Sequence, residues 1–71
     1  MSEEKEVIHL TTEELATRWR MSVSGLAAWR VQGKGPRYLK LGDGRHAQIL
    51  YPLSEVKTFE RMRFKQSTVS Q

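Results

Sequence analysis

The sequence predicts a small, mainly α-helical domain with a two-stranded β-hairpin, of the winged helix-turn-helix class. Three observations indicate this class. Two helix-start signals follow each other closely, a strand–turn–strand pattern comes next, and an amphipathic helical segment is the last pattern along the chain. The expected elements run helix, helix, strand, strand, helix within residues 9–64 of the 71-residue chain. One domain with a marginal core is all that this length allows. We expect residues 1–8 to form a disordered acidic arm and residues 65–71 a frayed tail.

The first helix has a strong start signal. Thr11 precedes Glu14 by three positions, which is the spacing of a capping box. The hydroxyl can accept from the amide of Glu14, and the carboxylate can accept from the amide of Thr11. The pattern predicts a helix from Thr12 to about Trp19. The side chains expected to face the core are Leu15, Ala16 and Trp19.

A second helix follows after a short turn, with Ser22 as its expected N-cap. Gly33 suits a C-terminal cap, and Pro36 prevents the helix from resuming. Two helices joined this tightly cross at a steep angle, which is the helix-turn-helix arrangement. We expect an inward group (Met21, Leu26, Trp29 and Val31) and an outward group (Ser24, Ala27, Ala28 and Arg30).

A hairpin is predicted after the second helix. Residues 37–41 alternate as a half-buried strand does, and residues 46–51 do the same. Asp43 and Gly44 between them are a favoured central pair for a tight turn, because both tolerate a positive φ. Arg45 would then lie near the tip. A lone hairpin is marginal in water, so this one must pack on the helices.

The third helix is expected to begin with Pro52 as its first helical residue, since the fixed φ of proline suits that position. An apolar stripe at helical spacing follows the proline. Its members are Leu53, Val56, Phe59 and Met62.

Charge is divided unevenly along the chain. Residues 1–17 carry one lysine and five glutamates, whereas residues 18–71 carry eleven lysines and arginines against three acidic residues. A small domain with such an excess attracts polyanions. Nucleic acid is the commonest polyanionic partner, and an anionic membrane is the second.

Placed on the expected fold, these cations outline a DNA-binding surface. The second helix would enter the major groove, where small side chains can contact thymine methyl groups. Arg45 would reach a phosphate or an adjacent minor groove. Few polar side chains are available to read bases, so we expect modest sequence specificity. The expected DNA-binding residues are Arg20, Ser22, Val23, Ser24, Ala27, Ala28 and Arg30 of the helix and turn, and Lys34, Arg37, Lys40, Arg45 and His46 of the linker and wing.

Other classes of function have little support. The chain has no cysteine, no Ser-His-acid set and no phosphate-cradling glycine motif, so we expect no enzyme and no cofactor. Two histidines without suitably spaced carboxylates do not predict a metal site. No apolar run is long enough to span a membrane, and the N-terminus does not read as a signal peptide. We therefore expect a cytoplasmic protein.

The ordered set of elements resembles the excisionase and AlpA-like small DNA-binding proteins, which are related to the MerR regulators. The resemblance covers about residues 9–62, and the matching parts are residues 10–16, 21–24, 33–42 and 49–51, with Leu26, Trp29 and Val56. It departs from the family where Val23, Gly25, Ala27 and Ala28 replace polar residues, and where Leu50 replaces a basic wing residue.

The resemblance implies an excisionase, a recombination directionality factor that binds repeated sites, bends DNA and helps an integrase excise a prophage or similar element. It implies integrase and further copies of the chain as partners, and a bacterial or phage-encoded protein that is associated with the nucleoid when bound. An AlpA-like transcriptional regulator on the same fold is the alternative. A protein-interaction module that does not bind DNA is the third possibility, favoured by the small apolar residues Ala27 and Ala28 and opposed by the excess of positive charge.

Overall fold

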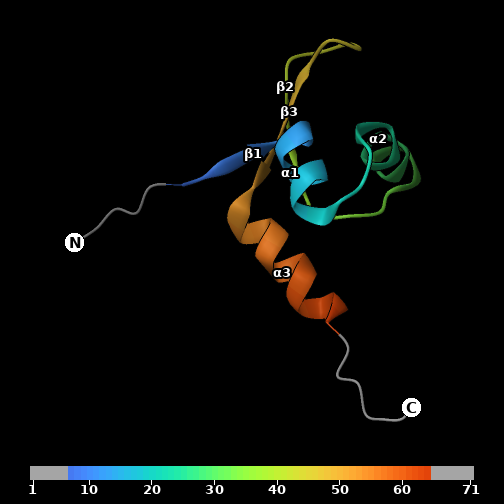
Figure 1. Ribbon diagram of the computed structural model, residues 1–71. Coiled ribbons are helices and arrows are strands. Elements are labelled where there is room, and N and C mark those ends of the chain that lie inside the picture. Colours follow the sequence, from blue (N-terminus) through green and yellow to red (C-terminus); the bar gives the residue numbers. More distant parts are fainter. Residues whose placement is uncertain (1–6, 65–71) are drawn as a thin grey trace, which may run out of the picture.

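The computed structural model describes residues 7–64, which form three α-helices and a three-stranded antiparallel sheet (Figure 1). The expected order of helices and hairpin strands is present, with one further strand ahead of the first helix. The expected tail at residues 65–71 and most of the expected arm lie outside the described residues. The elements are β1 (His9–Thr11), α1 (Thr12–Trp19), α2 (Val23–Gln32), β2 (Leu39–Leu41), β3 (Gln48–Pro52) and α3 (Leu53–Arg63).

The sheet has the strand order β1-β3-β2, so β3 is its centre. Leu10 of β1 pairs with Tyr51, and Lys40 of β2 pairs with Ile49. The predicted hairpin is present as β2 and β3, but the sheet has a third strand that was not predicted, because β1 pairs with the other edge of β3. A strand of three residues is too short to show an alternating pattern in the sequence. Beyond β1, the pairing continues through a hydrogen bond of 2.8 Å from the amide of Leu53 to the carbonyl of Ile8.

The connection between β2 and β3 also differs from the expectation. The register pairs Leu41 with Gln48, which leaves residues 42–47 as a loop and excludes a two-residue turn at Asp43 and Gly44. Instead, the amide of Ala47 donates to the carbonyl of Gly44 at 3.3 Å. Gly44 takes a φ of 82°, in the region that favours glycine. Arg45 and His46 are the central residues of this turn, so Arg45 is at the tip and His46 precedes the strand in which it was expected.

The helix ends follow the local signals. The capping box of α1 is present, with Glu14 N donating to Thr11 Oγ1 at 3.1 Å and Thr11 N donating to Glu14 Oε1 at 2.9 Å. Ser22 caps α2, because its Oγ accepts from Gly25 N at 2.9 Å. Gly33 ends α2 with a φ of 75°. These predictions are confirmed. Pro52 was expected as the first helical residue of α3 but is its N-cap, so the helix begins at Leu53. The proline cannot belong to the helix because it is still paired in β3.

The hydrophobic core lies between the sheet and the three helices. Its fully buried side chains are Leu15, Ala16, Leu26, Tyr51 and Val56, and the apolar side chains packed around them are Leu10, Trp19, Met21, Trp29, Ile49 and Leu53. Two expected core residues lie outside it: Val31 is 88% exposed and Met62 is 76% exposed. Val31 is five positions after Leu26, which places it about 140° around the helix from that buried side chain.

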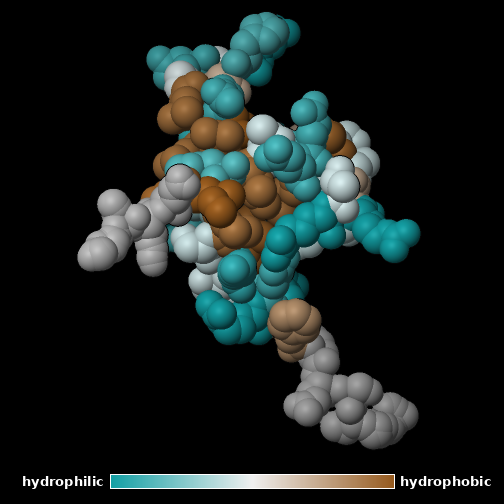
Figure 2. All heavy atoms as spheres, turned by 60° about the vertical axis from the view of Figure 1, so that its left-hand side comes forward, coloured by the Kyte–Doolittle hydropathy of each residue, from teal (hydrophilic) through white to brown (hydrophobic). Residues whose placement is uncertain are grey.

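The sheet has one covered and one open face, because successive side chains of a strand point to opposite sides. The face with Tyr51 packs against the helices. On the other face, Leu39 and Leu41 are 42% and 50% exposed. Figure 2 shows hydrophobic side chains gathered over the middle of the molecule and along the hairpin, with hydrophilic ones at the hairpin tip.

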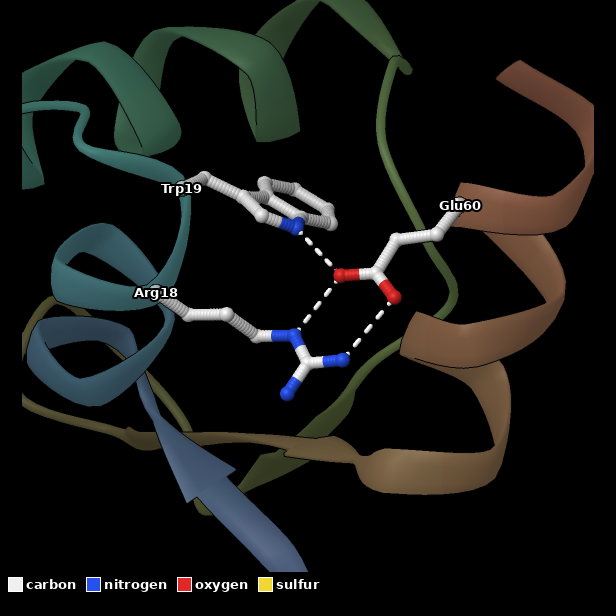
Figure 3. Close-up of polar contacts among 3 residues, drawn as sticks. All are labelled: Arg18, Trp19 and Glu60. Atoms are coloured by element: carbon white, nitrogen blue, oxygen red, sulfur yellow. Dashed lines mark hydrogen bonds and ion pairs between the residues drawn. The ribbon is translucent and has the colours of Figure 1, made fainter. Parts of the chain in front are cut away.

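A polar contact joins the end of α1 to α3 (Figure 3). The guanidinium of Arg18 donates to both carboxylate oxygens of Glu60, from Nε at 2.7 Å and from Nη2 at 2.9 Å. Trp19 Nε1 donates to Glu60 Oε2 at 2.6 Å. The hydrogen bonds from Arg18 and then from Trp19 lower the pKa of Glu60 to about 2. This contact holds the last turn of α1 against a helix more than forty positions later in the chain.

The lowered pKa of Glu60 predicts how stability depends on pH. The ionised form is favoured in the folded state, so its contribution is complete above the ordinary pKa of 4.5 and is lost as the pH falls toward 2. We expect Glu60→Gln to lower the melting temperature by about 5 °C at pH 7, with the difference closing by pH 2. Thermal melts by circular dichroism at pH 7, 4 and 2 measure this. Asp43→Asn, in the exposed hairpin loop, is the matched control. Equal pH profiles for wild type and Glu60→Gln would contradict the assignment.

Candidate nucleic-acid interface

The N-terminus of α2 is formed by two serines. Ser22 Oγ caps the helix and lies 3.3 Å from Ser24 Oγ. The first turn of α2 contains no acidic residue, whereas the first turns of α1 and α3 do. The amides at a helix N-terminus carry partial positive charge, and an acidic side chain there would compensate it. This end of α2 therefore keeps its positive character and has hydroxyl groups beside it.

The outward side of α2 is small and apolar. Val23 is 45% exposed, Ser24 and Ala28 are exposed, and Ala27 is half-buried. Val31, expected in the core, extends this surface by about one turn. Methyl groups make up most of it, with the Ser24 hydroxyl as its polar group near the start of the helix. Such a surface allows close approach of another molecule and offers few hydrogen bonds.

Arg30 does not face outward as expected. The side chain is half-buried, and its Nη1 donates to Tyr51 Oη at 2.9 Å and to Thr12 Oγ1 at 3.4 Å. Its guanidinium carbon also lies 5.8 Å from the centre of the Tyr38 ring. Arg30 follows Leu26 by four positions, so it shares the inward side of α2. Arg30 joins α2 to α1 and to the central strand, and its predicted contact with DNA stays a prediction.

The other expected cations are exposed. Arg20 ends α1 in the left-handed conformation, with a φ of 59°, and so begins the turn before α2. Lys34 follows the other end of α2, where its amide donates to the carbonyl of Trp29 at 2.8 Å. The hairpin and its linker supply the remaining members of the set: Arg37, Lys40, Arg45 and His46, all exposed. Lys40 pairs with Ile49 and therefore belongs to the sheet face that is directed toward the helices.

The expected interface residues fall into two groups. One group follows α2 and its flanking turns, and the other follows the hairpin, which extends beyond the helices in Figure 1. Helix α1 contacts both α2 and the sheet, so the two groups are held in one arrangement through α1. Among the expected interface residues that the structure describes, Ser22 and Ser24 are the two whose side chains lie within hydrogen-bond range of each other.

Two polar partners were missed by the sequence analysis. Tyr51 and Glu60 accept the hydrogen bonds that fix Arg30 and Arg18. Tyr51 is 21 positions from Arg30, and Glu60 is 42 positions from Arg18. No local spacing signals a pair at such a separation, so only the folded arrangement reveals it.

Among residues 7–64, no group of three or more His, Cys, Asp or Glu side chains is placed to hold a metal ion. No helix in that range is long and apolar enough to cross a membrane. No protein-family model, curated protein or solved structure matches this chain.

The position of Arg30 predicts a structural role that can be measured. We expect Arg30→Met, which keeps the apolar stem but not the hydrogen bonds, to lower the free energy of unfolding by about 1–2 kcal/mol. Urea denaturation followed by circular dichroism gives this value. The control, Arg37→Met, replaces an exposed arginine and should change stability by less than about 0.5 kcal/mol. Equal effects of the two substitutions would show that the Arg30–Tyr51 bond adds no stability.

Proposed function

We propose that this chain is a winged helix-turn-helix protein that binds double-stranded DNA, with α2 as the recognition helix and the β2–β3 hairpin as the wing. The observation that carries the proposal is the combination of residues at the two ends of α2 and in the turn before it. This helix follows α1 after the three residues 20–22, begins with capping hydroxyls and no acidic residue, and has exposed cations beyond both ends. DNA phosphates are attracted to cations and to helix N-termini.

In the proposed complex, α2 enters the major groove with its N-terminal end leading. Ser24 and the amides of the first turn approach a phosphate or a base edge, while Val23 and Ala28 approach thymine methyl groups. Arg20 and Lys34 neutralise phosphates on the two sides of the helix. Arg45, at the tip of the hairpin, reaches a neighbouring phosphate or the minor groove.

The small apolar face of α2 favours an architectural role. Bidentate contacts from Arg, Asn or Gln provide most discrimination between base pairs, and the outward face of α2 has none of these residues before Gln32, the last residue of the helix. Binding would then depend on DNA shape, on bending and on several copies at adjacent sites. These properties suit an excisionase acting beside an integrase, which is our preferred function. A transcriptional regulator of the AlpA-like kind, bound at one promoter, is the alternative.

Salt dependence tests the electrostatic part of the proposal. A protein making about five phosphate contacts should lose affinity with a log–log slope of roughly −4 to −5. Arg45→Ala and Lys34→Ala should each reduce the magnitude of this slope by about 1. Lys57→Ala removes an exposed positive charge from α3 and serves as the control that leaves the slope unchanged. Absence of DNA binding at low salt would overturn the proposal and favour a protein-interaction module.

Footprinting on the DNA flanking the gene for this chain separates the two DNA-binding functions. We expect protection of repeated adjacent sites, a bent complex by circular permutation of the sites, and stimulation of excision by the integrase of the same element. One protected promoter site, without bending and without an effect on excision, would replace the excisionase by the regulator.

A further inference from the structure

An open apolar groove lies where the end of α1 meets α2 and α3. It has a volume of about 580 Å³, and its apolar lining is Trp19, Met21, Trp29, Phe59 and Phe64. The three ring systems of Trp19, Trp29 and Phe59 pack with centroids 5.5–6.2 Å apart, yet each remains only half-buried. Phe64, at the end of α3, is 80% exposed. In so small a domain, a hollow lined by large aromatic rings indicates a surface that another molecule covers.

Three polar side chains of the groove have partners within the fold. The Glu60 carboxylate accepts from Arg18 and from Trp19 Nε1, so the donor of that indole is satisfied (Figure 3). The guanidinium carbon of Arg63 lies 4.9 Å from the centre of the Phe59 ring. The groove therefore presents an aromatic surface in which the indole donor of Trp19 is already satisfied, so apolar side chains can bind beside it at little desolvation cost.

Charge at the rim indicates what else the partner carries. Arg18 balances Glu60, and Arg63 in the last turn of α3, which also lines the groove, adds one further positive charge. The rim is therefore positive beside an apolar floor. We infer that this groove is a docking site for an amphipathic protein segment, helical and with acidic residues flanking its apolar face. Such a segment places apolar anchors at positions i, i+3, i+4 and i+7, as helices in grooves commonly do.

The groove and the proposed DNA-binding surface lie on different sides of α2. Trp29 and Ala28 are neighbours in sequence and so are separated by about 100° around the helix. Trp29 lines the groove, while Ala28 belongs to the outward side. An acidic segment can therefore occupy the groove whether or not DNA is bound, and the inference does not rest on the proposed function.

The chain reports on this groove directly, because its two tryptophans both line it. The probe is a 14-residue helical peptide with leucines at i, i+3, i+4 and i+7 and glutamates at the flanking positions. A matched peptide carries lysines in place of the glutamates. We expect the glutamate peptide to shift tryptophan emission to shorter wavelength in a saturable manner, and the lysine peptide to bind about 10-fold or more weakly.

Variants of the full chain locate the binding. Phe64→Ser should weaken binding of the glutamate peptide about 5-fold to 10-fold, and Arg63→Glu should reverse the preference between the two peptides. These side chains are exposed, and circular dichroism checks that the variants fold. Leu41→Ser removes an exposed leucine from the open face of the sheet and should leave binding unchanged. The comparison of the two peptides on wild type tests the inference even if a variant does not fold.

Several results would overturn the inference. One is no saturable shift with the glutamate peptide, and another is equal binding of both peptides. A shift produced instead by oligo(dT) would assign the groove to single-stranded DNA. Self-association in sedimentation that Phe64→Ser abolishes would assign it to a second copy. A shift of emission to longer wavelength on Val69→Ser, without peptide, would assign it to the C-terminal segment of the chain itself.

Discussion

The hydrogen bond from Arg30 to Tyr51 is the contact on which the arrangement of α2 and the hairpin depends. Tyr51 is 1% exposed and lies in the central strand, so its hydroxyl needs a partner inside the fold. Arg30 supplies that partner from α2, and the same guanidinium contacts Thr12 at the start of α1. One side chain therefore links a helix, the strand at the centre of the sheet and the first turn of another helix. Tyr51 also packs on Tyr38 just before β2, so the residue that Arg30 contacts is itself in contact with both sides of the hairpin. Arg30 therefore helps to fix the position of α2 relative to the hairpin.

This contact changes how the positive charge of the chain should be interpreted. Residues 18–71 hold eleven lysines and arginines, but Arg18 and Arg30 are held by partners within the fold. The charge of Arg18 is neutralised by Glu60, so this side chain would attract a phosphate only weakly. The cations available for a polyanion are the exposed ones beside α2 and on the hairpin, together with those at the end of α3. Net charge alone therefore overstates the number of cations that are free to contact a polyanion.

The features that were predicted from the sequence are local ones. The capping box at Thr11, the cap at Ser22 and the end of α2 at Gly33 each depend on atoms within a few residues, and all three are confirmed. The features that were missed depend on distant parts of the chain. Strand β1 exists because β3 lies beside it, and the hairpin loop has six residues because of the register of Leu41 with Gln48. The inward direction of Arg30 follows from a tyrosine 21 positions later, so charge alone suggested the wrong side of the helix.

A helix surface made mostly of methyl groups imposes a constraint on any DNA-binding role. Each good bidentate contact adds about 1–3 kcal/mol of discrimination between base pairs, and the outward side of α2 has no Arg, Asn or Gln to make one before its last residue, Gln32. The missing specificity must come from DNA shape, from neighbouring copies or from a protein partner that contributes contacts of its own. The aromatic groove beside α2 and α3 could hold such a protein partner, because its rings and the arginine at its rim suit an amphipathic acidic segment. A partner held there would raise the effective concentration of both proteins at one DNA site, so weak readout by α2 would still give selective assembly.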